Sequence, residues 1–335
     1  MPVKIVVFGA GRMGSAHART VARSARAELA GVADVDRAAA ERVVSDLRMG
    51  EVRTTEAFLD DPRVDAVVIA TSSPTHADLI VQAARAGKQI FCEKPISLDI
   101  DTTVRAIRAC EDAGVMLQIG FQRRFDRDFL NARAAIDADK IGEIRFARLV
   151  SRDRTLPPMA YIPTSGGQFR DQMIHDLDAA RWLLAPAEVE EVTATGSAAI
   201  APQIGQAGDV DTAVAVLRFS GGAIAVTDVS REAVYGYDVR TEIHGARGML
   251  LMGGDGMQNG RILDASFAKP QTDSFLTRFS DAYRAEIEGF IEVVAARGRP
   301  RVDGRDALQA LRIAIAADRS WRTGCTVKLS DVEGM

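Results

Sequence analysis

Residues 3–14 read VKIVVFGAGRMG, and this stretch decides the fold. Its first half is mostly β-branched, which is typical of a strand buried in a parallel sheet. Its second half matches the pattern G-x-G-x-x-G, and an alanine-rich stretch typical of a helix follows to about residue 26. The next apolar run, residues 29–33, ends in Asp34. A strand, a glycine turn, a helix, a strand and an acid in this order predict a dinucleotide-binding unit.

Each position of the glycine turn has a physical task. Gly9 permits the tight turn, Gly11 lets a pyrophosphate approach the backbone, and Gly14 lets the helix pack closely against the strand. Arg12 and Met13 lie where the helix begins, and its free N–H groups and positive dipole end favour phosphates. We expect all five residues to bind the cofactor; a turn that serves packing alone is the alternative.

Asp34 selects between the two nicotinamide cofactors. It lies 20 residues beyond Gly14, where a carboxylate can accept hydrogen bonds from both hydroxyls of the adenosine ribose. A 2′-phosphate would meet like charge there, so the sequence favours NAD over NADP. Arg37 could accommodate such a phosphate, which keeps NADP as the alternative.

Strands continue to alternate with helices along the first third of the chain. Further strands are expected at residues 65–70, 89–92 and 116–120. This alternation predicts a doubly wound parallel sheet, a Rossmann domain over residues 1–121. Ligands bind at the carboxyl ends of such strands. The further cofactor contacts expected at this edge are Thr71, Ser72, His76, Glu93 and Gln122. For His76 a capping or packing role at its helix start is an equal alternative.

Lys94 is the first candidate catalytic residue. It follows a predicted strand and is held between Glu93 and Pro95, whose ring stiffens the turn. Near NAD⁺, like charge and partial burial would lower the pKa of this amine and suit it to proton relay. The alternative is an ion pair with Glu93 or Asp99 at a helix start.

A second constellation occupies residues 166–184. Taken as one helix, this segment places Asp171, His175 and Asp178 on a narrow arc that faces water or a cleft. The buried stripe is expected to consist of Ile174, Leu177, Arg181 and Leu184. Because histidine is the usual general base near neutral pH, His175 oriented by Asp171 is a candidate base. A solvated Asp–His pair is the alternative.

Hydride transfer connects these candidates. Oxidation of a secondary alcohol needs a base for the hydroxyl proton and a cation near the developing alkoxide, while the hydride goes to a nicotinamide. We expect Lys94 to supply the cation and His175 with Asp171 the base.

Length and composition limit the protein class. The 335 residues exceed what one core usually holds, so a second domain is expected over residues 122–335. The net charge of −4, with acids and bases interspersed, argues against nucleic acid as a partner. Three isolated cysteines predict no metal site and a reducing cytoplasm. The chain shows no signal-peptide layout and no apolar run of membrane-spanning length, so no membrane association is expected.

The second domain is predicted to be α+β, with a large open, mainly antiparallel sheet. Its strands are expected at residues 143–151, 189–196, 211–219, 222–231 and 239–252, followed by helices near 280–297 and 304–322. Four apolar residues could form a self-association surface; the alternative is that they belong to the core between strands and helices. They are Val214, Val216, Ile224 and Val226.

The motifs together resemble one family. GAGRMG with Asp34, FCEKP at 91–95, FQRRFD at 121–126 and SGGQFRDQMIHDLDAARWLL at 165–184 resemble the glucose–fructose oxidoreductase/inositol dehydrogenase/MocA family over nearly the whole chain. Three further segments are most similar to its inositol 2-dehydrogenases: Ser151–Asp153, the proline-rich segment to Ile162, and Tyr235–Asp238.

The resemblance implies NAD-dependent oxidation of the C2 hydroxyl of myo-inositol, or of a related cyclic polyol, to a ketone. It implies a Lys94/Asp171/His175 triad in which His175 takes the proton and Lys94 polarises the oxygen. It also places four residues near the substrate hydroxyls: Arg124, Asp153, Asp178 and Tyr235.

Relatives of this type assemble into homotetramers or dimers, so a homo-oligomer is expected. Two alternatives stay open. One is a dehydrogenase of another inositol isomer or sugar, such as scyllo-inositol or glucose, and the other is a non-catalytic NAD-binding regulator. Some inositol dehydrogenases have His in place of Ser151 and Asn in place of Asp153, a difference that concerns the preferred stereoisomer.

Overall fold

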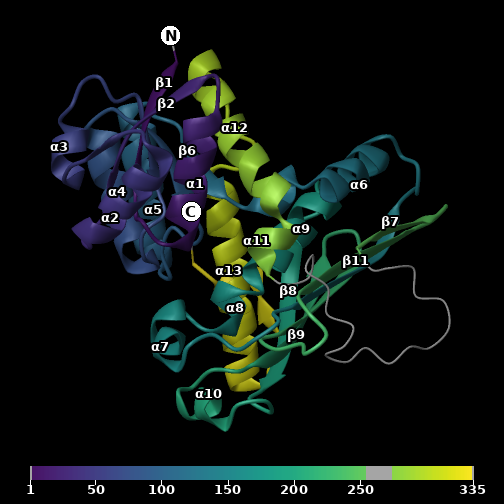
Figure 1. Ribbon diagram of the computed structural model, residues 1–335. Coiled ribbons are helices and arrows are strands. Elements are labelled where there is room, and N and C mark those ends of the chain that lie inside the picture. Colours follow the sequence, from purple (N-terminus) through teal and green to yellow (C-terminus); the bar gives the residue numbers. More distant parts are fainter. Residues whose placement is uncertain (1, 254–273, 334–335) are drawn as a thin grey trace. The chain divides into compact units, whose positions relative to one another are not determined.

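The computed structural model describes residues 2–253 and 274–333 (Figure 1). Two compact units divide the chain. The first comprises Met1–Gln122 and Asp281–Leu308, and the second comprises Arg123–Ser280 and Gln309–Glu333. Among the described residues, no helix combines the length and the apolarity needed to cross a membrane.

The first unit is built on a parallel six-stranded sheet in the order β3-β2-β1-β4-β5-β6. The strands are β1 (Val3–Phe8), β2 (Ala27–Ala33), β3 (Glu51–Val52), β4 (Ala66–Ile69), β5 (Gln89–Glu93) and β6 (Leu117–Gly120). This is the strand order of a dinucleotide-binding Rossmann fold, so the predicted fold is confirmed. β3 was not predicted, because two residues carry no periodic signal.

Helices connect these parallel strands. They are α1 (Arg12–Arg23), α2 (Arg37–Leu47), α3 (Thr55–Leu59), α4 (Ser73–Arg85) and α5 (Ile100–Ala113). Side chains that accept a backbone N–H cap α2, α3 and α5: Asp36, Thr54 and Asp99. Such caps satisfy donors that the first helical turn leaves without an intrahelical partner. Helix α1 differs, because its N-cap is Gly11 and has no side-chain hydrogen bond.

One late helix belongs to the first unit. Ile287, Phe290 and Ile291 of α12 (Ser280–Ala296) pack into the same core as the strands β1, β2 and β4. The sequence analysis assigned this helix to a domain of residues 122–335, whereas the structure groups Asp281–Leu308 with the nucleotide-binding fold. Apolar periodicity predicts which face of a helix is buried but not which sheet covers it.

The second unit contains a seven-stranded sheet in the order β12-β11-β7-β10-β9-β8-β13. The strands are β7 (Ile144–Arg152), β8 (Val189–Ser197), β9 (Thr212–Phe219), β10 (Ile224–Ser230), β11 (Asp238–Gly245), β12 (Met249–Met252) and β13 (Val327–Lys328). Strands β7 and β10 pair in parallel and the other pairs are antiparallel. The expected mainly antiparallel sheet is confirmed, and the expected strand 239–252 is a hairpin of β11 and β12.

The remaining described helices lie before, between and after these strands along the chain. They are η1 (Gln122–Phe125), α6 (Arg127–Asp137), η2 (Met159–Tyr161), α7 (Ile162–Ser165), α8 (Gln168–Asp171), α9 (Ile174–Leu184), α10 (Pro202–Gln206), α11 (Phe275–Arg278), α13 (Gly304–Thr323) and η5 (Leu329–Asp331). The prediction of one helix over residues 166–184 is wrong. A turn at residues 172–173 separates α8 from α9, so the angular positions calculated for a single helix do not hold across it.

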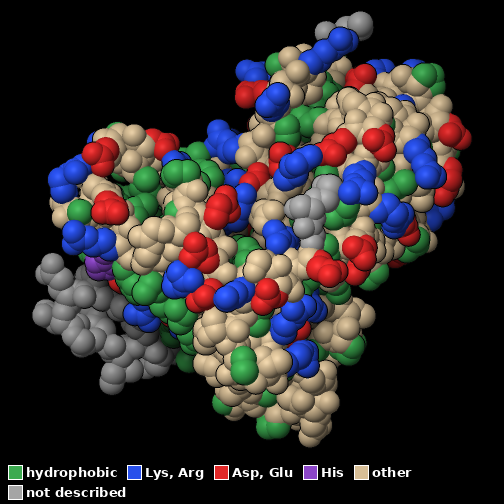
Figure 2. Space-filling view, turned by 180° about the vertical axis from the view of Figure 1, so that it is seen from behind, with side chains coloured by type: hydrophobic (Ala, Val, Ile, Leu, Met, Phe, Trp, Pro, Cys, Tyr) green, Lys and Arg blue, Asp and Glu red, His purple; other side chains and the backbone are tan. Residues whose placement is uncertain are grey.

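Charged side chains of both signs are intermixed on the face drawn in Figure 2. No broad area of one sign stands out on that face. This distribution agrees with the interspersed acids and bases of the sequence.

Candidate active site

The turn between β1 and α1 fits a dinucleotide pyrophosphate. Gly9 has φ +101°, and a Cβ there would lie 2.4 Å from the carbonyl oxygen of Ala70. A Cβ on Gly14 would lie 1.9 Å from the carbonyl oxygen of Gly9. By contrast, a Cβ on Gly11 would meet nothing within 4 Å. Gly9 and Gly14 are therefore required by the protein itself, and Gly11 faces open space where a ligand can approach the backbone.

The helix end beside this turn is also suited to an anion. The first turn of α1, which begins with Arg12 and Met13, contains no acidic residue and has no side-chain cap. Its N–H groups and dipole can therefore act on a bound phosphate.

Asp34 lies directly after β2. Its two carboxylate oxygens accept hydrogen bonds from the N–H of Ala10 at 2.6 Å and of Asp36 at 2.8 Å. A carboxylate has about four acceptor positions, so two are left for the vicinal hydroxyls of a ribose. Arg37 donates to Glu41 at 2.8 Å within α2.

The loop after β4 carries Thr71, Ser72 and His76. The ring of His76 is buried, with Nδ1 2.8 Å from the carbonyl oxygen of Pro95 and Nε2 3.2 Å from that of Thr71. Burial lowers the pKa of His76 below its usual range. His76 therefore joins two loops at the carboxyl edge of the sheet, which is the packing role that the sequence analysis weighed. The hydroxyls of Thr71 and Thr75 are 2.7 Å apart, and Ser72 is the N-cap of α4.

The segment Glu93–Pro95 follows at the neighbouring strand end, and the Lys94–Pro95 peptide bond is cis. Glu93 Oε1 lies 2.7 Å from Nε2 of His17, so this carboxylate is bound inside the first unit. Asp99 caps α5, and its hydrogen bonds with Thr102 lower the pKa of its carboxyl group.

Gln122, the last cofactor contact expected from the sequence, is buried. Its Oε1 has no hydrogen-bond partner among the described residues. A buried amide oxygen without a protein partner fits a ligand that brings a donor.

In the second unit, Asp171 ends α8 and is oriented by two protein groups. The hydroxyl of Tyr161 donates to Asp171 Oδ1 at 2.9 Å, and Arg231 Nη1 lies 3.3 Å from Oδ2. Arg231 is almost fully buried and also contacts Asp209 at 3.2 Å. His175 follows in the first turn of α9 and is partly exposed, as Asp171 is. The two partly exposed side chains thus lie on either side of the short connection between the helices.

Asp178 does not lie where the single-helix interpretation placed it. Its side chain is buried and forms a double hydrogen bond with the guanidinium of Arg124, at 2.9 and 2.6 Å. The expectation that Asp178 faces water or a cleft is therefore wrong. A cation 54 residues earlier in the chain supplies the partner that makes this burial possible. The groups assigned to the substrate by resemblance, Arg124 and Asp178, are bound to each other.

A neighbouring buried cluster was missed by the sequence analysis. Arg123 contacts Asp176 at 2.5 Å and Ser151 at 2.8 Å, and the Ser151 hydroxyl donates to Asp176 at 2.9 Å. The consecutive arginines of FQRRFD were a signal, since two adjacent cations in an aromatic setting need acidic partners.

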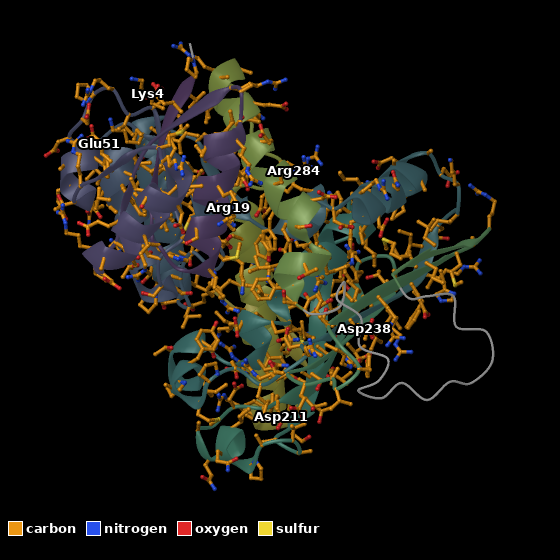
Figure 3. All side chains as sticks on the ribbon, viewed as in Figure 1. Lys4, Arg19, Glu51, Asp211, Asp238 and Arg284 are labelled. Carbon is orange, nitrogen blue, oxygen red and sulfur yellow. The ribbon has the colours of Figure 1, made fainter. Side chains whose placement is uncertain are left out.

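Two predicted substrate residues lie near the ends of strands β7 and β11. The N–H of Asp153 donates to the carbonyl oxygen of Ser230 at 2.9 Å. Tyr235 donates its hydroxyl to Asp238 at 3.1 Å, and burial raises the pKa of Tyr235. Asp238, labelled in Figure 3, also pairs with Arg240.

The predicted residues thus divide between the two units. Lys94 and the dinucleotide residues belong to the first unit, and Asp171, His175 and the other substrate candidates belong to the second. Among the described residues, one group of histidine and carboxylate side chains has its potential metal-ligand atoms close together: His17, Glu93 and Glu286. It lies in the first unit.

Family models match both parts of the chain. Residues 3–121 match the model described as "Oxidoreductase family, NAD-binding Rossmann fold", and residues 129–251 match the "GFO/IDH/MocA C-terminal domain".

Similar proteins agree with these matches over almost the full length. The chain is 43% identical to inositol 2-dehydrogenase of Rhizobium meliloti, over 96% of this chain and 97% of that protein. It is 38% identical to scyllo-inositol 2-dehydrogenase (NAD(+)) of Bacillus subtilis, over 98% of this chain and 96% of that protein.

Two solved structures share the fold. Myo-inositol dehydrogenase of Corynebacterium glutamicum has a TM-score of 0.88 at 34% identity, with 98% of this chain and 99% of that chain covered. Scyllo-inositol dehydrogenase of Lactobacillus casei, with bound NAD(H) and scyllo-inositol, has a TM-score of 0.88 at 29% identity, with 98% and 100% covered.

Proposed function

The chain belongs to the GFO/IDH/MocA oxidoreductase family, and on this premise we propose that it oxidises the C2 hydroxyl of myo-inositol to a ketone with NAD as hydride acceptor. The observation that carries the proposal is the setting of Asp171. Arg231 and Tyr161 hold this carboxylate from two sides, four residues before His175. A carboxylate fixed in this way can orient an imidazole and stabilise its protonated form.

The chemistry assigns one task to each residue of the triad. Bound NAD⁺ supplies the acceptor for the hydride that leaves the carbinol carbon. His175 accepts the hydroxyl proton, and Asp171 stabilises the imidazolium that results. Lys94 places its ammonium group beside the oxygen and stabilises the charge that develops before the carbonyl double bond forms.

The dinucleotide residues have separate roles. Gly9 and Gly14 shape the turn, Gly11 leaves the approach open, and Asp34 retains two acceptor positions for the ribose. The negative charge of Asp34 would repel a 2′-phosphate, which supports a preference for NAD over NADP.

Scyllo-inositol is the second candidate substrate, since a relative of 38% identity carries that activity. The two inositols differ in configuration at one carbon, so discrimination depends on side chains around that carbon. Asp153 and Tyr235 are the candidates for this choice, because Arg124 and Asp178 are bound to each other.

A substrate panel tests the proposal directly. Purified protein is given NAD⁺ or NADP⁺ with myo-inositol, scyllo-inositol or glucose, and reduced nicotinamide is followed by absorbance. We expect turnover with NAD⁺ and myo-inositol, and at least a hundredfold loss of kcat in Lys94→Ala and His175→Ala, with NAD⁺ binding retained in His175→Ala. NAD⁺ binding without turnover of any polyol would instead favour a regulator.

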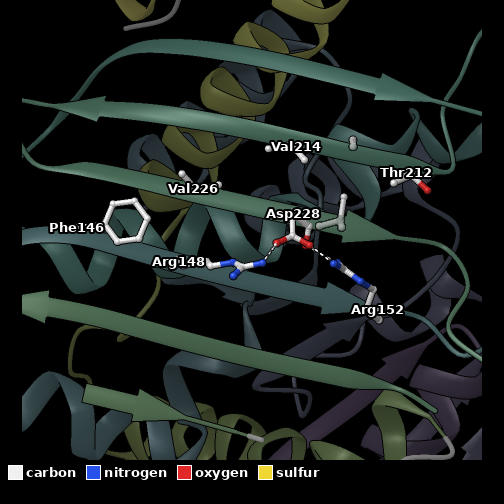
Figure 4. Close-up of a pocket in the computed structure, with 9 residues that line it drawn as sticks. Phe146, Arg148, Arg152, Thr212, Val214, Val226 and Asp228 are labelled. Carbon is white, nitrogen blue, oxygen red and sulfur yellow. Dashed lines mark hydrogen bonds and ion pairs between the residues drawn. The ribbon is translucent and has the colours of Figure 1, made fainter. Parts of the chain in front are cut away.

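One face of the second sheet supports self-association. Along β9 and β10, Ala213, Ala215 and Leu217 are buried, whereas Val216 and Ile224 on the opposite face are well exposed. Figure 4 shows this less covered face, where Val214 and Val226 lie near a pocket that also contains the Arg148–Asp228 ion pair. The exposure of Val216 and Ile224 favours a self-association surface over the alternative, a core between strands and helices.

We therefore propose a homo-oligomer, a tetramer or dimer, that covers this face. Light scattering should give a multiple of the monomer mass, and Ile224→Arg should reduce it. Gln82→Arg, which introduces the same charge at an exposed position of α4 in the first unit, is the control and should leave the mass unchanged. A cytoplasmic location is the matching proposal, supported by the free cysteines.

A further inference from the structure

Three ionisable side chains from distant parts of the sequence meet inside the first unit. His17 comes from α1, Glu93 ends β5, and Glu286 comes from α12. Their potential ligand atoms all lie within 4.8 Å of one another. His17 and Glu286 are completely buried. Since ionisable groups are rarely buried without a role or a partner, the cluster requires an explanation.

Glu286 is the unusual member. Neither of its carboxyl oxygens has a hydrogen-bond partner among the described residues. Burial, followed by the charge of Glu93, raises the pKa of Glu286 well above its usual range. This direction favours the neutral acid of Glu286, which can offer a hydrogen-bond donor.

His17 is the direct contact of Glu93, with Nε2 2.7 Å from Oε1. Its other nitrogen, Nδ1, has no partner among the described residues. The imidazole lies between aromatic rings, with centroids 5.3 Å from Phe91 and 6.3 Å from Tyr283. In the tautomer that carries its proton on Nε2, the ring donates a hydrogen bond to Glu93.

Glu93 is restrained from a third side by β6. Its backbone pairs with Gly120, and a Cβ on Gly120 would lie 3.0 Å from Glu93 Oε2. Glycine at this position therefore leaves the space that the carboxylate occupies. The next residue along the chain is Lys94, so a backbone displacement at Glu93 also moves the peptide from which the lysine extends.

We propose that His17 and Glu286 are positioning residues that hold the Glu93 side chain in place and so fix the turn that presents Lys94. His17 contacts Glu93 directly, and Glu286 lies beside both groups in the buried cluster. The inference rests on the proposed function, because it assigns the cluster a task through Lys94.

The first experiment measures Lys94 without relying on turnover. Reductive methylation of the whole protein with NAD⁺ present, followed by mass spectrometry, gives the labelling rate of each lysine as a function of pH. In Glu286→Leu we expect the rate at Lys94 to change at least threefold, whereas Lys4, an exposed lysine labelled in Figure 3, is unchanged. An unchanged rate at Lys94 in a folded variant would overturn the proposal.

A conservative variant tests the proton on Glu286. Glu286→Gln keeps the shape and a donor, so we expect its Lys94 labelling rate, kcat and pH profile of kcat/KM to stay within about twofold of wild type. If Glu286→Gln behaves like Glu286→Leu, the neutral-acid assignment is wrong. The same three side chains could instead bind a divalent metal ion. Elemental analysis of the purified protein tests this: one equivalent of bound metal that is lost in Glu286→Leu would overturn the proposal.

A third variant tests the position of Glu93 without replacing any ionisable residue. Gly120→Ala should displace the Glu93 carboxylate and lower kcat about fivefold with a KM change below twofold. Gly298→Ala, where a Cβ meets only an ordinary contact at 3.6 Å, is the matched control. If wild type turns over no polyol, the proposed function fails, while the labelling of Lys94 still decides whether the cluster positions it.

Discussion

The guanidinium of Arg231 bridges Asp171 and Asp209, with nitrogen–oxygen distances of 3.3 and 3.2 Å. Arg231 is among the most completely buried large side chains of the described protein. Asp209 in turn accepts the N–H of Gln168, at the start of the short helix that Asp171 ends. The bridge therefore fixes both ends of α8 and keeps the Asp171 carboxylate oriented.

Replacement of Arg231 should affect stability and catalysis together. Arg231→Met leaves two partly buried carboxylates without their common cation, a loss of about 3–5 kcal/mol of unfolding free energy. Urea denaturation measures this loss, and the same variant should lose kcat with myo-inositol because Asp171 is no longer held.

Tyr161→Phe is the milder companion variant. It removes one hydrogen bond to Asp171 from an exposed side chain, so the unfolding free energy should change by less than about 1 kcal/mol. A fewfold fall in kcat is expected. A Tyr161→Phe protein with unchanged kcat would show that the hydroxyl does not orient Asp171.

Two glycines of the turn should differ in their effect, because Gly14 is required for folding and Gly11 for ligand binding. Gly11→Ala adds a Cβ in open space, so the melting temperature should stay nearly constant while NAD⁺ affinity falls at least tenfold. Gly14→Ala places a Cβ 1.9 Å from a carbonyl oxygen and should lower the melting temperature as well. Calorimetry of both variants with and without NAD⁺ checks this; equal loss of stability in the two would contradict it.

Asp34 should control the choice of cofactor. Asp34→Ala removes the acceptors for the ribose hydroxyls and the like charge that repels a 2′-phosphate. The ratio of NAD⁺ to NADP⁺ affinity should therefore fall at least tenfold. Asp36→Ala, which removes the cap of α2 and an exposed ion pair with Arg42, is the control and should keep the ratio.

Much of the fold followed from local patterns. Buried strands and the glycine turn have short-range signatures, so the Rossmann unit was predicted almost strand by strand. The two-residue strand β3 carries no such signature. The return of α12 to the first unit depends on contacts between residues such as Ile5 and Phe290, far apart in the chain.

The candidate site was predicted less completely, because ion pairs between distant residues decide which polar side chains are buried. Helix α9 is buried on most of its surface, so the search for one polar arc failed. Asp178 became a core residue through Arg124, and nothing near Arg231 in the sequence indicated its contact with Asp171. The sequence shows where each carboxylate is, but not which distant arginine will pair with it in the folded protein.

His76 should make stability depend on pH. Its pKa is lowered by burial, so the folded protein holds the ring neutral while the unfolded chain takes up a proton below about pH 6.5. The stabilising contribution is therefore present above that pH and is lost as the pH falls toward the lower pKa of the folded state. Melting temperatures between pH 8 and 5 should fall less steeply in His76→Gln than in wild type; parallel curves would exclude His76 as a cause.

The Arg124–Asp178 pair should behave as a structural unit rather than as a substrate contact. Arg124→Leu or Asp178→Leu alone leaves one buried charge and should cost about 3–5 kcal/mol of unfolding free energy. The double variant removes both charges and should recover most of that loss, as measured by a denaturation cycle. Its KM for myo-inositol should stay within about threefold of wild type if neither group binds a ring hydroxyl. A rise of tenfold or more in KM, with stability recovered, would return both residues to the substrate site.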